Sequence, residues 1–380
     1  MQEAAKNNNL DIIYYILSQQ EAIKTNYFNR CRYLSKISIP PTIKTIEHSS
    51  FKGCTNLTHV SIPPSVTTID GKAFSKCSLL EQISAPSVVK FGFGTFNECT
   101  LLKKVKLSPE LRIIYQNLFF GCENLKQINL PPFCTSLGDS SFFRCLSLKH
   151  LDIPQTVKSI GSFCFNGCKS LVQLTLPTTL TSIGSHAFAG CKSIKEMTIP
   201  ASVASLGESV FSACTSLEHI EILCKLNEIK NHVFNACESL KEITIPPSVT
   251  SIEFGAFSHC IALTQIIIPP LVKTFGDSVF QDCRSLVKIE LPSSLEKIER
   301  YAFWGCSAIR EISIPSSVIE IGESAFSSCT SLISITIPPS VKSIGKNGFE
   351  NCTSLAQISI PASINPENLG LSQNTKVTMT

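Results

Sequence analysis

The stretch A-F-S-S-C-T-S-L-I-S-I-T-I-P, residues 325–338, contains a pair, Phe326 and Cys329, that recurs along the chain. The pair occurs fifteen times between Phe28 and Cys352, at intervals of 23 residues with a single interval of 22. The positions around it repeat as well, as A-F-x-x-C-x-S-L-x-x-I-x-I-P-x-S-V-x-S-I-G. A period this regular indicates a repeat protein, in which each copy forms one structural unit.

Each part of the repeat predicts a local structure. Ile335 and Ile337 alternate with polar residues, which is typical of a strand with one buried face, and Pro338 ends that strand because it lacks an N–H. A second apolar pair, Val341 and Ile344, turns inward. The glycine that follows in many copies permits a tight bend or a positive φ. The A-F-x-x-C segment is short, so we expect one helical or 3₁₀ turn there.

One coil cannot bury its apolar face alone, but stacked coils bury a continuous core. The sequence therefore predicts a β-rich α/β solenoid of about fifteen 23-residue coils, with a parallel sheet and short helical or 3₁₀ turns. We expect three parts: residues 1–27 as a helical N-terminal cap, 28–364 as the solenoid, and 365–380 as a C-terminal cap or tail. In the first part, helical spacing places Leu10, Ile13, Tyr14 and Leu17 on one stripe.

The chain has eighteen cysteines, and three of them, Cys134, Cys164 and Cys224, lie outside the repeated pair. Equivalent side chains in a stack point the same way, whereas the two Cβ atoms of a disulfide must converge. Free cysteine packs as a small buried apolar residue, so we interpret the column as packing, with disulfides as the alternative. Zinc needs converging pairs of ligands, and C-x-x-C and C-x-x-H pairs are absent, so we predict no metal and no cofactor.

The strand motif L-x-x-I-x-I-P, preceded by A-F-x-x-C-x-S-L and followed by S-V-x-S-I-G, closely resembles the BspA-like subclass of leucine-rich repeats over residues 28–364. The resemblance implies a right-handed solenoid with a parallel sheet. It also implies a role at the cell surface, because members in bacteria and parasitic protists are regarded as surface proteins that bind host matrix or other cells. The family supplies no catalytic residues to carry over.

The location of the protein is open at this point. No signal peptide or apolar run long enough to span a membrane is evident, and a thiol-rich chain suits a reducing compartment, which favours the cytoplasm. The family resemblance favours the cell surface instead. The net charge of +4 over 380 residues is too mild to indicate nucleic acid as a partner.

Two groups of residues are candidate binding residues. A basic patch, suited to an acidic partner, consists of Lys103, Lys126, Lys149 and Arg112. The first three stand at the same phase of the repeat. The outward positions of the predicted strands form a polar face, which we call the strand face and whose candidate residues are Lys104, Lys106, Gln127, Asn129, His150, Asp152, Gln173, Thr175, Glu196, Thr198, His219, Glu221, Glu242 and Thr244.

Nothing in the sequence indicates catalysis. The seven histidines fall at scattered phases of the repeat, and no phosphate-binding loop or nucleophile motif occurs. We therefore expect a non-enzymatic scaffold of the surface-adhesion type that binds protein or matrix macromolecules of the host, or self, along its strand face. The alternative is an intracellular leucine-rich repeat scaffold or regulator of a protein partner.

Overall fold

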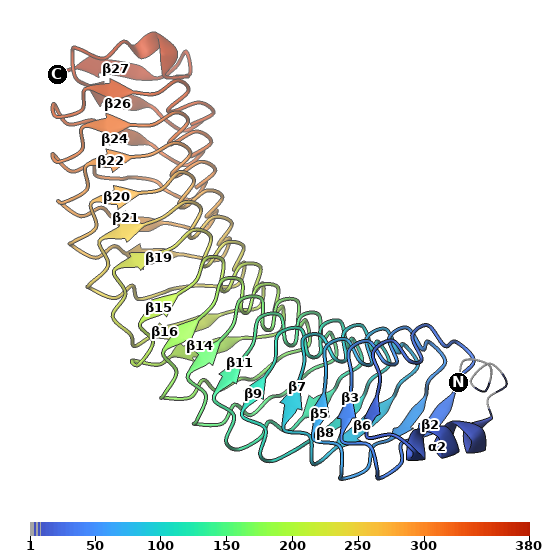
Figure 1. Cartoon of the computed structure of the whole chain (residues 1–380). Coiled ribbons are helices and arrows are strands. Elements are labelled where there is room, and N and C mark those ends of the chain that lie inside the picture. Colours follow the sequence, from blue (N-terminus) through green and yellow to red (C-terminus); the bar gives the residue numbers. More distant parts are fainter. Residues whose placement is uncertain (1–3, 5–6, 8) are drawn as a thin grey trace. The chain divides into compact units, whose positions relative to one another are not determined.

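The computed structural model describes residues 4, 7 and 9–380 and divides into two compact units, Met1–Ile194 and Lys195–Thr380. Each unit is a stack of coils, and the coils are joined by parallel strands that follow one another in Figure 1. The chain makes about sixteen turns of roughly 23 residues and contains very little helix. The prediction of a parallel-strand solenoid is confirmed.

The N-terminal helix is α2 (Leu10–Ser18), and the side chain of Asn9 caps it by accepting a hydrogen bond from the backbone N–H of Ile12 at 3.2 Å. The helix buries Ile13 and Leu17 against the coils. Leu10 and Tyr14, which the sequence placed on the same stripe, are 38% and 44% exposed. The buried stripe is therefore narrower than predicted. Residues 1–3, 5, 6 and 8 of the predicted cap lie outside the described residues.

The first strand series comes from the L-x-x-I-x-I-P motif. In the first unit its strands are β2 (Lys36–Ser38), β4 (His59–Ser61), β6 (Gln82–Ala85), β8 (Lys104–Leu107) and β10 (Gln127–Ile128). In the second unit they are β14 (Glu196–Ile199), β16 (His219–Ile222), β19 (Gln265–Ile267), β21 (Lys288–Glu290), β24 (Ser334–Thr336) and β26 (Gln357–Ile360). β27 (Lys376–Met379) lies outside the motif and continues the series by pairing in parallel with β26. Neighbours pair in parallel with a one-coil offset, as Ile37 does with Val60.

A second strand series comes from the S-I-G motif, where the sequence predicted only an inward apolar pair. In the first unit it consists of β1 (Ala22–Ile23), β3 (Thr45–Ile46), β5 (Thr68–Ile69), β7 (Lys90–Phe91), β9 (Ile113–Ile114), β11 (Ser136–Leu137), β12 (Ser159–Ile160) and β13 (Ser182–Ile183). In the second unit it consists of β15 (Ser205–Leu206), β17 (Glu228–Ile229), β18 (Ser251–Ile252), β20 (Thr274–Phe275), β22 (Lys297–Ile298), β23 (Glu320–Ile321) and β25 (Ser343–Ile344). A short 3₁₀ helix, η1 (Pro366–Asn368), precedes β27.

The glycine of the S-I-G motif serves close approach rather than a special φ. Gly345 follows β25 and does not have a positive φ. A Cβ at this position would lie 2.4 Å from the backbone nitrogen of Glu323 in the preceding coil. Glycine therefore lets two backbones come together where the chain leaves the second strand series.

The Phe-x-x-Cys segments form a column of turns rather than helices, which we call the turn column. Within a coil, Cys54 N–H donates to Phe51 O at 3.1 Å, the i→i+3 bond of a 3₁₀ turn. Ser49 and Gly53, two residues before and after Phe51, have φ of 54° and 72°. All fifteen segments carry such a pair of left-handed residues, which stop the turn from continuing as a helix. The N–H groups of Ser49, Phe51 and Gly53 donate to the following coil.

The phenylalanines of the turn column form the centre of the core in each unit. Every one of the fifteen rings is at most 2% exposed. Phe51 and Phe74 stack with their ring centroids 5.1 Å apart and 1° between the planes, and Phe303 and Phe326 stack at 5.3 Å and 8°. The continuous core expected from stacked coils is therefore built around these rings within each unit.

All eighteen cysteines are free thiols, so the packing interpretation is confirmed over the disulfide alternative. The sequence did not predict that the column thiols also donate hydrogen bonds. Cys54 Sγ lies 3.0 Å from the carbonyl oxygen of Phe28 in the preceding coil, and Cys191 Sγ lies 3.1 Å from that of Phe165. Burial raises the pKa of the Cys54 thiol from an ordinary 9.0 to about 12. The Cys54 thiol is therefore held in its neutral, unreactive form.

Candidate ligand-binding face

The strand face is exposed because each strand of the first series buries every second side chain. In β14, Met197 is 3% exposed, while Glu196 and Thr198 on either side of it point to solvent. β6 shows the same alternation, with Ile83 and Ala85 buried. The core of each coil therefore fixes which positions face outward, and leaves the identity of the outward residues free.

All fourteen candidate residues of the strand face are exposed. Those in the first unit are Lys104, Lys106, Gln127, Asn129, His150, Asp152, Gln173 and Thr175. Those in the second unit are Glu196, Thr198, His219, Glu221, Glu242 and Thr244. Their role in binding stays a prediction.

The strand register brings several of these side chains into neighbouring rows. Lys104 pairs with Gln82 on one side and Gln127 on the other, because β8 lies between β6 and β10. His150 forms an isolated parallel bridge with Gln173. The polar groups of successive coils therefore line up along the stack in the first unit.

The basic patch is only partly brought together. Lys126 precedes Gln127 and Lys103 precedes Lys104, so the pairing of β10 with β8 places these two lysines side by side. The backbone N–H of Lys149 reaches the carbonyl oxygen of Lys126 at 3.5 Å, which continues the row. Arg112 stands apart from this row in the fold, because it precedes β9 of the second strand series.

A shallow concavity of about 760 Å³ lies on the strand face across β4, β6, β8 and β10. We call it the lysine concavity. Its lining residues are His59, Val60, Gln82, Ile83, Ser84, Lys103, Lys104, Val105, Lys106, Lys126, Gln127, Ile128 and Asn129. Four of these thirteen side chains are lysines, and none is a carboxylate. This part of the face therefore presents charge of one sign.

An ion pair at the rim modifies the predicted patch. Lys103 Nζ lies 3.0 Å from Glu81 Oε2, and both side chains are about half exposed, so the pair contributes little to stability. The sequence analysis missed Glu81 as a partner. The signal was present, because Glu81 stands one coil before Lys103 at the same phase of the repeat. His59 and Gln82 stand at the same phase of the repeat as Lys104, and Ser84 stands at the phase of Lys106, so all three could have been added to the strand face.

The strand face of the second unit carries compensated charges instead. Glu218 lies between Lys195 and Lys241, with oxygen to nitrogen distances of 3.9 and 3.8 Å. Thr198 Oγ1 donates to Glu221 at 3.4 Å across β14 and β16. The strand-face carboxylates here include Glu196 and Glu242, and the lysines Lys195 and Lys241 precede them directly in the chain.

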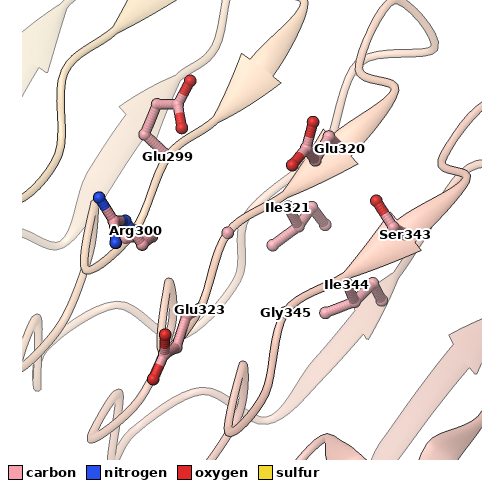
Figure 2. Close-up of a pocket in the computed structure, with 9 residues that line it drawn as sticks. Glu299, Arg300, Glu320, Ile321, Glu323, Ser343, Ile344 and Gly345 are labelled. Carbon is pink, nitrogen blue, oxygen red and sulfur yellow. The ribbon is translucent and has the colours of Figure 1, made fainter.

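A second hollow, of about 360 Å³, lies beside β23 and β25 in the second unit (Figure 2). Figure 2 shows Glu320 and Glu299 on successive coils, with Arg300 below them. Arg300 is held by Asp277 at 3.0 Å, and Glu320 is held by Lys297 at 2.9 Å. Burial raises the pKa of Glu299. The charged groups are partly engaged in pairs, and the hollow does not assemble a set of groups around one ligand position.

Residues 4, 7 and 9–380 contain no group of three or more His, Cys, Asp or Glu side chains arranged to hold a metal ion. Across the same part of the chain, no helix has the length and apolar character needed to cross a bilayer.

The similarity of this chain to known proteins extends over its repeats. The model of the BspA type leucine-rich repeat region, which contains six copies, matches residues 21–149, 135–263 and 250–370. A leucine-rich repeat protein from Bacteroides ovatus is 26% identical, covering 94% of this chain and 87% of that chain, with a TM-score of 0.64. A leucine-rich cell surface protein from Faecalibacterium prausnitzii is 26% identical, covering 89% and 82%, with a TM-score of 0.49. None of the curated proteins matches the chain.

Proposed function

Because the chain belongs to the BspA type leucine-rich repeat family, we propose that it is a non-enzymatic scaffold that binds a macromolecular partner along its strand face, in an adhesion role at the cell surface. Leucine-rich repeat scaffolds bind proteins as a general role and are generally not enzymes. The observation that carries the proposal is the exposure of all fourteen candidate residues, which lie on strands of the first series or at the equivalent positions of coils that have no strand there.

The form of the strand face supports a large partner rather than a small one. The strands of the first series present polar side chains over many coils. The floor of the lysine concavity consists of strand residues of this face, and the concavity is therefore shallow. A small molecule needs a concave site that buries most of its surface. A macromolecule can instead gain affinity from many contacts spread over a large area.

A second candidate function is an intracellular scaffold or regulator of a protein partner. The observation that favours it is the state of the cysteines, since all eighteen are free and seventeen are buried. Disulfides are common in oxidising compartments, and free thiols persist most easily in reducing ones. The two candidates share the strand face and differ in the compartment where it is presented.

Labelling of intact source cells with a membrane-impermeant, amine-reactive reagent distinguishes the two candidate functions. Exposed lysines such as Lys104 and Lys106 are the acceptors. Recovery of the chain in the labelled fraction, with a cytosolic marker unlabelled, supports the adhesion role. Full protection of the chain, together with strong labelling of a known surface protein, rejects that role and leaves the intracellular scaffold.

A further inference from the structure

We propose that the lysine concavity binds a linear acidic polysaccharide, a sugar chain that carries sulfate or carboxylate groups. The inference rests on the proposed function in one respect, that the strand face is the binding face. It goes further by assigning a ligand class to a defined part of that face in the first unit.

The first support is the charge of the concavity. Lys103 is engaged by Glu81 at 3.0 Å, whereas Lys104, Lys106 and Lys126 have no ion pair among residues 4, 7 and 9–380. Like charges on neighbouring strands of one sheet face repel each other. A polyanion lying across them offsets this repulsion and is attracted by each ammonium group. The concavity therefore favours a negatively charged ligand.

The second support is the chemistry between the lysines. Gln82, Ser84, Gln127 and Asn129 also line the concavity, and their amides and hydroxyls are both donors and acceptors. A sugar chain presents hydroxyl groups, which also donate and accept, between its anionic groups. The lining therefore offers partners for both kinds of group on the same ligand.

The third support is the direction of the concavity. Its lining residues come from four successive coils, those of β4, β6, β8 and β10. Parallel strands lie about 4.8 Å apart, so these four strands span roughly 15 Å along the stack. A linear ligand that runs along the stack meets a fresh row of polar groups at each coil.

The residues that are missing from the lining argue against other macromolecules. The thirteen lining residues include no Trp, Tyr, Phe, Arg or Met. Protein interfaces are enriched in these residues and depleted in lysine, and their strongest contacts come from Trp, Tyr and Arg. Single-stranded nucleic acids need aromatic platforms on which bases can stack. A hydrophilic polyanion without bases or apolar side chains fits this lining best.

The test uses the full chain and heparin, a sulfated polysaccharide, in a titration at several NaCl concentrations. A site variant carries Lys104→Ala, Lys106→Ala and Lys126→Ala. A matched control variant carries Lys273→Ala, Lys342→Ala and Lys346→Ala, which are exposed lysines of the second unit with no ion pair in the described residues. The net charge changes equally in both. We expect the Kd of the site variant to rise at least about tenfold and that of the control less than about twofold.

Further arms identify the ligand class. A variant with Arg at all three site positions should keep heparin binding, and the thermal unfolding midpoint of every variant should match that of the original chain. Alginate, which carries carboxylates only, separates carboxylate from sulfate recognition. Equal losses in the site and control variants, no binding of either polysaccharide, or tighter binding of single-stranded DNA or poly-glutamate through the same lysines would overturn the proposal.

Failure of the polysaccharide proposal can be distinguished from failure of the proposed function. If heparin binding fails while a protein partner is still captured through the strand face, the ligand class is wrong and the scaffold function stands. If variants of the strand face lose neither ligand, the binding face itself has been assigned wrongly.

Discussion

The turn column and the strand face run along the same coils, but residues repeat from coil to coil in the turn column and vary on the strand face. In the turn column, Phe and Cys recur in every copy, and all the rings and all the thiols except that of Cys31 are buried. On the strand face, equivalent positions of successive coils carry Ser84, Lys106, Asn129 and Asp152, and all four are exposed. The inward positions must fit the same neighbours above and below. The outward positions meet solvent, so they are free to change from coil to coil without changing the fold.

The largest expected difference between the two regions concerns alkaline pH. Burial raises the pKa of Cys99 and Cys260 to about 12, above an ordinary value of 9.0. The folded state therefore keeps its protons longer than the unfolded state, and stability present below pH 9 is lost as pH rises from 9 toward 12. Each such thiol contributes about 1.4 kcal/mol per pH unit in that range. Urea unfolding at pH 8 to 11 measures this loss.

The matched variant for the pH prediction is Cys260→Ala, which removes one thiol without adding charge. Its free energy of unfolding should fall less steeply with pH than that of the original chain, by about 1.4 kcal/mol per unit. A urea midpoint that stays constant between pH 9 and 11 would contradict a role for the buried thiols.

The Phe188→Ala substitution probes the turn column at neutral pH. The ring is fully buried, and its removal leaves a cavity that the stacked coils cannot fill. We expect a loss of about 3 to 5 kcal/mol in the free energy of unfolding. Urea denaturation followed by circular dichroism measures it. An almost unchanged midpoint would show that the assigned register of the column is wrong.

The Cys191→Ala substitution in the same coil should cost much less. It removes one sulfur atom and the hydrogen bond from Cys191 Sγ to Phe165 O at 3.1 Å. A typical hydrogen bond contributes about 1 kcal/mol, and the carbonyl also accepts the backbone N–H of Cys168, so it keeps a partner. The same urea experiment should give a loss of about 1 to 2 kcal/mol. A loss as large as that for Phe188→Ala would show that the thiol has more than a packing role.

The Ala213→Gly substitution should stabilise the chain slightly. Ala213 has a φ of 58°, a conformation that costs a side chain about 1 kcal/mol and glycine almost nothing. The gain is reduced by the greater freedom of glycine in the unfolded chain, so we expect about 0.5 kcal/mol. Ala201→Gly is the control, because Ala201 is exposed and has no positive φ, and it should destabilise. Thermal unfolding compares the two variants.

The smallest effect on stability is expected on the strand face itself. Lys106 is exposed and makes no ion pair within residues 4, 7 and 9–380, so Lys106→Ala should change the free energy of unfolding by less than about 0.5 kcal/mol. Differential scanning calorimetry beside Phe188→Ala tests the contrast directly. A destabilisation above about 1 kcal/mol would mean that this face also contributes to the fold.

The core could be predicted from the sequence because each of its positions repeats. Phe326, Cys329 and Ile335 define a period, and the period defines the parallel pairing. The second strand series was missed because two residues per coil, such as Ser343 and Ile344, are too few to show an alternation. The left-handed positions were missed for another reason. Ser, Lys, Tyr and Ala occupy many of them, and none of these residues signals a positive φ.

The binding residues could be predicted only as a set of outward positions. The phase of Lys104 and Lys106 in the repeat was enough to place them on the strand face. Their meeting in a concavity without carboxylates depends on which residues occupy the neighbouring coils, and on the pairing of Glu81 with Lys103. A repeat does not specify these choices, because the outward positions are free to vary. The ligand class can therefore be inferred only from the folded strand face.

The backbone hydrogen bonds of the turn column have an electrostatic consequence. Their N–H groups point toward the following coil, as those of Ser49, Phe51 and Gly53 do. By contrast, the N–H groups of Lys44 and Glu47, which flank β3 of the second strand series, donate to the preceding coil. Peptide dipoles on two sides of one coil therefore oppose each other along the stack. In an α-helix all peptide dipoles align and leave partial charges at both ends. Within each unit, coils can be added without building up such end charges.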